Sequence, residues 1–360
     1  MTDGQRESHS PATATPEAAP PDLAAIPESA LLDLRLSQLP VRIEGTWLEA
    51  KVAQLHSELA ARDIRFAPRC YLADEWLTPE GEPVIGIPFY LAHPRLIALQ
   101  KKMLLEAEGD TEEWCMKLLR HEAGHALSYA FGLNRRRSWQ RVFGHSSEDY
   151  NETYRFRPYS RSFVRHLDYY YAQYHPDEDF VETFAVWLTP GLDWRKQYEG
   201  WKALDKLLFV DKLMKSIAGK PPLKATGRQL WKIATIRSTL SRYYKKRRET
   251  EAEDFAEFHD DNLRRMFTTG AAQGETRRRV DQVLHAHRKA LLSTVSSWTG
   301  ERRYMVNEVY KKVHQRCRAL HLVTADPETV AVLQLATYLT TLLMNYRYTN
   351  RLRGSVKGKG

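Results

Sequence analysis

The feature that most constrains the fold is the pentapeptide HEAGH at positions 121–125. Residues 111–131 around it place apolar side chains at helical spacing, and Gly132 follows where a helix commonly ends on glycine. Residues four apart share one face of an α-helix, so His121 and His125 project from neighbouring turns on the same side. The sequence therefore predicts a helix that presents two imidazoles together.

This pair of imidazoles fits a zinc site. Two histidines one turn apart can reach one Zn²⁺ at about 2.0–2.1 Å, and HExxH on a helix is typical of zinc-dependent hydrolases. Glu122 lies beside the first histidine, where it can take a proton from a water acidified by the metal. We therefore expect Zn²⁺ as cofactor and Glu122 as the catalytic base.

A catalytic zinc site needs a third protein ligand, and the segment PDEDFVE at 176–182 offers several. Proline suits the first turn of a helix, and acids there suit the helix dipole. Glu178 and Glu182 lie four apart and share a helix face, so one can bind the metal while the other supports a histidine. His145 is a further candidate ligand, and the residues alone leave these alternatives open.

HEAGH together with EDFVETFA at 178–185 resembles the gluzincin clan of metallopeptidases. More narrowly, it looks like a bacterial group of zinc-binding metallopeptidases. It is also similar to the catalytic domain of anthrax lethal factor and to the Mlc-titration-factor peptidases. The resemblance covers roughly residues 65–215. It implies a zincin-like α+β domain, with a small sheet, an HExxH helix and a third-ligand helix, that hydrolyses peptide bonds.

The resemblance also assigns site residues. In these relatives the second helix supplies a glutamate as third zinc ligand and a further acid one turn later. Matched residue by residue, Glu178 takes the ligand position, and Glu182 falls where an acid orients the first histidine, His121. In lethal-factor-like relatives a tyrosine shortly before this helix points into the site. Tyr171 or Tyr174 is expected to act in that way, stabilising the charge that develops on the carbonyl oxygen.

Short apolar runs between Ile64 and Leu91 indicate strands. The turn sequence Pro-Glu-Gly at 79–81 separates two of these runs, which predicts a β-hairpin with 83–91 as its second strand. Gly86 inside that strand allows another backbone to approach closely. We expect a peptide or protein substrate to add as an extra strand along 83–91.

Charge is distributed unevenly along the chain. Residues 1–220 contain 27 Lys and Arg against 32 Asp and Glu, whereas residues 221–360 contain 27 against 13. A basic C-terminal part suggests a nucleic acid or another acidic partner, although lysines and arginines on the outside of a helical bundle produce the same bias. Helical spacing near 276–297, 301–320 and 327–347 predicts such a bundle.

The sequence thus divides into four predicted segments. These are a disordered tail at 1–30, the zincin-like metallopeptidase domain at 31–220, a basic helical domain or extension at 221–350, and a flexible tail at 351–360.

No transmembrane segment is expected, because the most apolar late stretch, 329–344, is too short and is interrupted by polar residues. The N-terminus lacks the pattern of a signal peptide. Three widely spaced cysteines, Cys70, Cys115 and Cys317, fit reduced thiols and a cytoplasmic location.

Two other functions compete with a zinc peptidase. The basic helices can make the protein a nucleic-acid-associated protease or binding protein, and a site completed by His145 would resemble SprT-like proteases that act on DNA-bound proteins. Alternatively, the chain is a non-catalytic adaptor stabilised by zinc. The intact Glu122 favours the peptidase.

Overall fold

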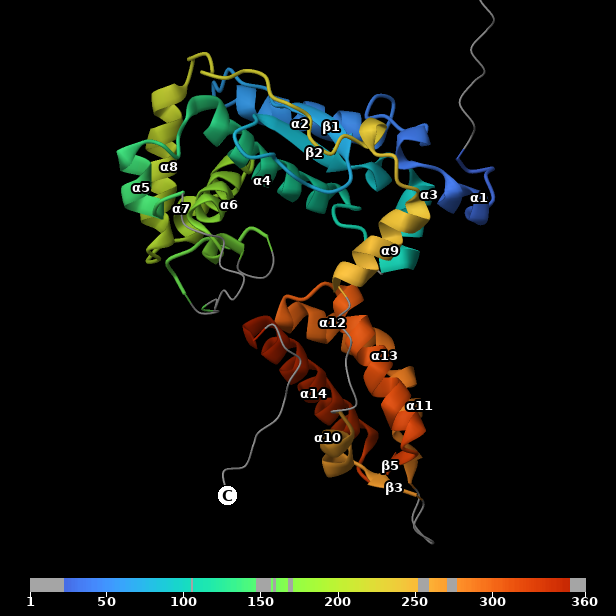
Figure 1. Cartoon of the computed structure of the whole chain (residues 1–360). Coiled ribbons are helices and arrows are strands. Elements are labelled where there is room, and N and C mark those ends of the chain that lie inside the picture. The colour runs from blue at the N-terminus through green and yellow to red at the C-terminus, as the bar shows by residue number, and fades with distance from the viewer. Residues whose placement is uncertain are drawn as a thin grey trace, which may run out of the picture.

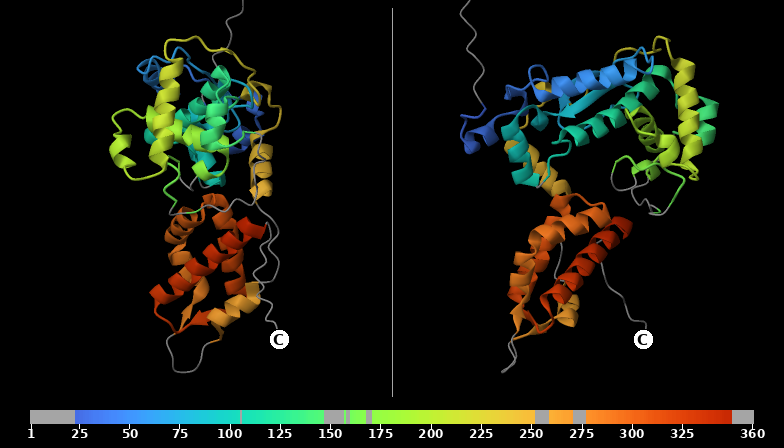
Figure 2. Two further views of the ribbon diagram at one scale, coloured as in Figure 1. Left: turned by 90° about the vertical axis from the view of Figure 1, so that its left-hand side faces the viewer. Right: turned by 180° about the vertical axis from the view of Figure 1, so that it is seen from behind.

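The computed structural model describes residues 23–104, 106–146, 157, 160–167, 171–251, 259–270 and 277–349. The predicted tails therefore lie largely outside the described residues. Within them the chain is rich in α-helix and has two small sheets, which agrees with the expected α+β class. Figures 1 and 2 show two helical units, one above the other, joined beside α9.

The first unit contains most of the described chain. Its helices are α1 (Glu28–Asp33), α2 (Trp47–Ala60), α3 (Pro94–Leu104), α4 (Glu112–Phe131), α5 (Arg137–Phe143), α6 (Pro176–Leu188), α7 (Trp194–Gln197), α8 (Ala203–Ile217) and α9 (Leu240–Glu251). Its strands are β1 (Arg69–Ala73) and β2 (Val84–Pro88), and its short 3-10 helices are η1 (Leu36–Gln38), η2 (Phe89–Ala92), η3 (Tyr171–Gln173) and η4 (Ile233–Thr235).

The second unit is smaller and mostly helical. It consists of α10 (His259–Met266), β3 (Thr268–Thr269), β4 (Arg278–Arg279), α11 (Val280–Ala286), α12 (Arg288–Thr299), α13 (Arg303–Ala319), β5 (Leu322–Thr324) and α14 (Glu328–Thr349). The short strand β5 pairs antiparallel with β3 on one side and β4 on the other. The helix predicted at 276–297 is divided into α11 and α12 at His287.

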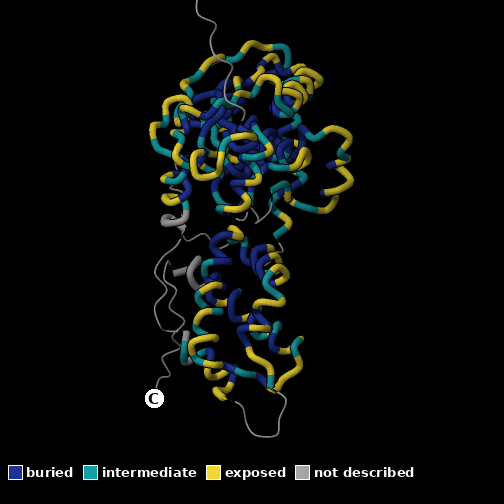
Figure 3. Tube along the Cα trace, turned by 90° about the vertical axis from the view of Figure 1, so that its right-hand side faces the viewer, coloured by how far each residue is buried: buried dark blue, intermediate teal, exposed yellow. Residues whose placement is uncertain are grey.

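Each unit has its own hydrophobic core, visible as the buried interior of each body in Figure 3. The first core runs from Leu23 to Tyr244, and the second from Leu263 to Leu343. Tyr304 at the start of α13 is the exception, because it packs into the first core. The cores therefore separate after α9, later in the chain than the boundary near 220 suggested by the charge distribution.

A strap at 218–239 explains why the first unit extends so far. The amides of Leu223 and Lys224 both donate to the carbonyl of Ala130 at the end of α4. Farther along, Lys232 forms an isolated antiparallel bridge to Ala73 at the end of β1. These contacts attach the strap to the first unit. The strap leads into α9, whose residues Leu240, Tyr243 and Tyr244 are buried in the first core.

The predicted hairpin is wrong in its first strand, because the strand at 69–73 does not pair antiparallel with β2. Strands β1 and β2 pair in parallel, with Tyr71 opposite Gly86, so the chain between them loops back before β2 begins. Leu77 in that loop then pairs antiparallel with Gly86 on the other edge of β2, through N···O distances of 2.8 and 3.3 Å. The expected close approach at Gly86 is observed, because a Cβ there would lie 2.7 Å from Leu77 Cδ2.

Helices α4 and α6 pack against each other and form the centre of the first unit (Figure 1). Thr111 caps the start of α4 by accepting the Trp114 amide, and Gly132 ends it with a φ of 57°. Helix α6 begins as the sequence predicts, at Pro176, with the His175 side chain accepting the Asp177 amide. Both predicted helices are therefore confirmed, together with Gly132 at the end of α4 and Pro176 at the start of α6.

The apolar stretch at 329–344 lies within α14, where Leu335, Leu339 and Leu342 are buried in the second core. Among the helices of the described residues, none is both long enough and apolar enough to cross a membrane.

Candidate metal centre

Three side chains converge where α4 faces α6. Nε2 of His121 lies 3.2 Å from Oε2 of Glu178, and Nε2 of His125 lies 3.5 Å from the same oxygen. One ligand atom from each residue falls within 4.8 Å of the others, and among the described residues this is the only cluster of its kind. His121 and Glu178 are buried and His125 is nearly so, which keeps the cluster away from bulk water.

The donor set fits zinc. Bonds of 2.0–2.1 Å in a tetrahedral arrangement place neighbouring ligand atoms about 3.3 Å apart. The two measured separations, 3.2 and 3.5 Å, lie close to this value. Two imidazoles and one carboxylate are also a ligand set found in catalytic zinc sites, which leave a fourth position for water or substrate. His121, His125 and Glu178 are therefore the residues that would hold the metal.

The electrostatics of the cluster favour an ionised carboxylate. Burial by itself would make Glu178 harder to ionise, but His125 and His121 more than compensate and hold the pKa of Glu178 well below its ordinary value. Burial likewise opposes charge on His121, yet the hydrogen bonds that this imidazole donates to Glu178 and Glu182 raise its pKa. The site thus stabilises positive charge beside its carboxylates, as a cation site requires.

Glu182 holds His121 in place. Its Oε1 lies 2.8 Å from Nδ1 of His121, and because a carboxylate only accepts, Nδ1 is the donor. Its Oε2 accepts the Leu167 amide at 2.8 Å. With Nδ1 occupied, Nε2 is directed towards Glu178. The structure therefore places Glu182 behind a histidine, as the resemblance implied, and places Glu178 in the cluster.

Glu122, the expected base, lies on α4 between the two histidines. Thr78 donates its hydroxyl to Glu122 Oε2 at 2.8 Å, which fixes the carboxylate. Burial raises the pKa of Glu122, while the neighbouring His121 and His125 partly oppose the shift. A carboxyl group with a raised pKa is better matched to proton transfer near neutral pH.

The two candidate tyrosines lie in and just after η3, immediately before α6. The Tyr171 ring centroid is 5.5 Å from that of His121, and the Tyr174 ring stacks on Tyr171 at 6.0 Å. Tyr171 is 39% exposed and lines the same cavity as His121. Of the two tyrosines, Tyr171 is the one with a ring contact to a histidine of the cluster.

His145 is exposed and follows α5. It does not belong to the cluster formed by the described residues. The structure thus separates this alternative ligand from His121 and His125.

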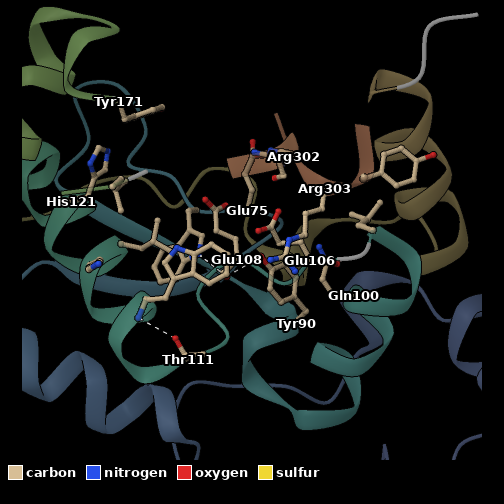
Figure 4. A pocket seen from close by; sticks show the side chains of 18 of the residues that line it. Glu75, Tyr90, Gln100, Glu106, Glu108, Thr111, His121, Tyr171, Arg302 and Arg303 are labelled. Carbon is tan, nitrogen blue, oxygen red and sulfur yellow. Dashed lines mark hydrogen bonds between the residues drawn. The ribbon is translucent and has the colours of Figure 1, made fainter. Parts of the chain in front are cut away.

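A cavity of about 660 Å³ reaches His121 and Glu122 of the candidate metal centre and is lined by residues of both units (Figure 4). His121, Glu122 and Tyr171 line its end in the first unit, and Arg302 and Arg303 line it from the corner between α12 and α13. Because this corner lies about 180 residues beyond the HExxH motif, local spacing gives no indication of its role.

The predicted substrate edge is also wrong. Every residue of β2 is buried, and Leu77 covers the edge of this strand that β1 leaves open. The stretch of backbone next to the candidate metal centre is the segment around Leu77 rather than β2, since the residue after Leu77, Thr78, contacts Glu122. Sequence reasoning missed Thr78, and no pattern in the loop pointed to it.

Comparisons of the chain with family models, with curated proteins and with solved structures found no match.

Proposed function

We propose that this chain is a zinc-dependent peptidase with a zincin-like domain of gluzincin type. One observation carries the proposal: His121, His125 and Glu178 direct three suitable ligand atoms to one buried point, with Glu122 beside it. The arrangement has the further support of Glu182, which orients His121 through Nδ1.

Each residue has a role in this proposal. His121, His125 and Glu178 bind Zn²⁺, which when bound supplies Lewis acidity towards a water and towards the scissile carbonyl. Glu122 accepts the proton of the attacking water at its carboxylate and passes it to the leaving amine. The hydroxyl of Tyr171 donates a hydrogen bond to the carbonyl oxygen as negative charge develops there.

The substrate in this proposal is an extended peptide. The cavity is lined by residues of both units, from His121 in the first to Arg303 in the second, which suits a chain rather than a small compact ligand. The peptide lies along the segment around Leu77, the stretch of backbone that borders Glu122 through Thr78. Main-chain pairing of this kind makes little demand on substrate sequence.

The test replaces Glu122 with Gln. The purified variant should bind zinc in the same ratio as the parent protein, while hydrolysis of a quenched fluorescent casein disappears. Glu112→Gln is the matched control, because Glu112 lies on the same helix but its side chain is 76% exposed. If the Glu122→Gln protein hydrolyses casein at the parental rate, the proposed mechanism is wrong. Bound zinc with no turnover by the parent would instead favour the non-catalytic adaptor.

The basic C-terminal unit contributes Arg302 and Arg303 to the cavity lining but no residue to the His121, His125 and Glu178 cluster. Exposed arginines gather near its small sheet, among them Arg264, Arg265 and Arg278. An acidic partner such as nucleic acid stays a prediction from charge, to be tested by salt-dependent binding.

A further inference from the structure

The loop between α3 and α4 holds Glu108 inside the cavity at a fixed position. The indole of Trp76 and the hydroxyl of Tyr90 both donate to the Glu108 carbonyl, each at 3.2 Å. The next residue, Gly109, has a φ of 85° and lies against Trp76, where a Cβ would be 3.0 Å from the ring. The backbone is thus anchored independently of the Glu108 side chain.

Glu108 has no ion-pair partner among the described residues, unlike Glu75 and Glu113, which line the same cavity. Glu75 pairs with Arg247 at 2.6 Å and Glu113 with Lys117 at 3.6 Å. Glu106 accepts the backbone N–H of Arg303 at the start of α13. By contrast, no ion pair within the described part of the chain involves the Glu108 carboxylate.

The charge of Glu108 acts on both ends of the cavity. Burial and the charges of Glu178 and Glu122 raise the pKa of Tyr171, and Glu108 adds to this shift. After burial, Glu108 is also the main cause of the raised pKa of Glu106. The carboxylate therefore lies between the metal centre and the α12–α13 corner, and its negative charge is felt at both.

Aromatic side chains share the cavity with this carboxylate. Trp76, Trp114 and Tyr171 all line the same cavity, and each keeps part of its surface accessible. Aromatic faces attract ammonium and guanidinium groups and also pack against the alkyl stems that carry them. An unpaired carboxylate beside accessible rings is a suitable environment for an organic cation.

We propose that Glu108 receives a positively charged group of the peptide substrate, next to the bond that is cleaved. The inference rests on the proposed peptidase function and adds a substrate class to it. The cation can be a lysine or arginine side chain, or the amino terminus of the peptide itself. Both have the same chemistry at Glu108, and the experiment below separates them.

The experiment measures binding rather than turnover. The zinc-loaded Glu122→Gln protein is titrated into three fluorescently labelled peptides of one sequence: acetylated with a central Lys, acetylated with Gln in its place, and this Gln peptide with a free amino terminus. We expect a cationic peptide to bind about tenfold more tightly than the acetylated Gln peptide, as one charged hydrogen bond provides. A gain from Lys assigns the cation to a side chain, and a gain from the free terminus indicates an exopeptidase.

Variants in the same background then test the residue. Adding Glu108→Gln should abolish the preference, so that the cationic peptide and the acetylated Gln peptide bind with about equal affinity. Adding Glu108→Lys should instead favour a peptide with Glu at the central position. Adding Glu112→Gln instead should leave the preference unchanged, because that side chain points to Lys51, 2.6 Å away, on the outer side of α4. Zinc content and circular dichroism check that each variant is folded.

Two results would overturn the inference. One is equal affinity for all three peptides, and the other is a preference that persists after Glu108→Gln. Either leaves the peptidase proposal intact, because hydrolysis by the protein with Glu122 is measured separately. Conversely, unchanged hydrolysis after Glu122→Gln would remove the peptidase mechanism without altering the binding result. If the Glu108 variants fail to fold, the preference of the protein with Glu108 intact should still weaken at high salt, since the contact is ionic.

Discussion

Glu182 and His121 are joined by a contact of 2.8 Å between Oε1 and Nδ1, and the second oxygen of Glu182 is held by the Leu167 amide. Glu182 is fully buried, so this pair is not loosened by water. The contact fixes both the rotation of the imidazole and the nitrogen that carries its proton. The other ring nitrogen of His121, Nε2, is thereby held towards Glu178, where it would serve as a ligand in the proposed metal site.

Glu182→Ala should therefore weaken zinc binding without abolishing it. The loss of a group that orients a ligand typically costs 10- to 100-fold in metal affinity, and we expect about that reduction here. Competition with a chromogenic chelator measures the affinity. The zinc affinity of the Glu182→Gln variant should lie between those of the parent and of Glu182→Ala, because the amide oxygen of glutamine can still accept from Nδ1 of His121. Parental affinity in the alanine variant would show that Glu182 has no orienting role.

The identity of the third ligand gives a second prediction. Glu178→Ala removes the only carboxylate whose oxygen lies within 3.5 Å of both Nε2 atoms among the described residues. We expect this variant to lose zinc on dialysis, as measured by atomic absorption. His145→Ala is the control and should retain one zinc per chain, because His145 lies outside the cluster. The reverse pattern would assign the metal to His145.

The helices that carry the site could be predicted from the sequence because their determinants are local. The four-residue spacing of the histidines, the glycine after Phe131 and the proline at the start of α6 all act within one or two turns. The same holds for the shared face of Glu178 and Glu182. The family resemblance supplied the choice between these two acids; in the structure Glu178 lies within 3.5 Å of Nε2 of both histidines and Glu182 lies 2.8 Å from Nδ1 of His121.

Pairings between distant segments could not be predicted in this way. The parallel register of β1 with β2 depends on how the intervening loop packs, and turn residues alone suggested a hairpin. Thr78 contacts Glu122, which lies 44 positions later in the chain. Tyr304 packs into a core whose other residues all precede it by a longer stretch of sequence. Periodicity carries no information about such contacts, because it reports only which side of an element is apolar.

Tyr171→Phe should reduce turnover while leaving the metal in place. The ring lies 5.5 Å from that of His121, but the tyrosine is not one of the cluster ligands. Loss of one hydrogen-bond donor to a developing oxyanion costs about 10²–10³ in kcat, and we expect a decrease of that order at unchanged zinc content. Tyr174→Phe should have a smaller effect, since the Tyr174 ring stacks on Tyr171, whereas the Tyr171 ring contacts His121. Equal losses in both variants would contradict the assignment of Tyr171.

Gly124→Ala tests the close packing of α4 and α6. A Cβ at this position would lie 2.9 Å from the Cβ of Val181 and 3.1 Å from its Cα, which cannot move without shifting the helix. Overpacking costs about 1–3 kcal/mol, and the better helix propensity of alanine returns roughly 1 kcal/mol. We expect a net loss of about 1 kcal/mol in the free energy of unfolding, measured in urea, and weaker zinc binding because the ligand helices separate.

The control for this substitution is Ser128→Ala, at a buried position on the same helix where alanine adds no atom. It should leave zinc affinity unchanged. A Gly124→Ala protein as stable as its parent would mean that the two helices are farther apart than the structure shows.

Glu82 anchors the strap that crosses the first unit, and its ionisation makes this anchor sensitive to pH. Its Oε2 accepts from Lys224 Nζ at 2.7 Å and from the Arg228 amide at 3.0 Å, and its Oε1 accepts from Arg228 Nε at 2.9 Å. The hydrogen bonds from Lys224 and then Arg228 lower the pKa of Glu82 to about 2. In the unfolded chain the same group titrates at its ordinary value of about 4.3.

Because the folded pKa is the lower one, the ionised carboxylate stabilises the native state fully above about pH 5. This contribution declines as the pH falls from about 4.3 towards 2 and is absent below that. Glu82→Gln lacks it at every pH, so its melting temperature should lie below that of the parent at pH 7 and converge with it near pH 2. Glu80→Gln, at an exposed position two residues earlier, should follow the parent throughout. A constant difference between Glu82→Gln and the parent across this range would show that Glu82 stabilises the strap by packing rather than by charge.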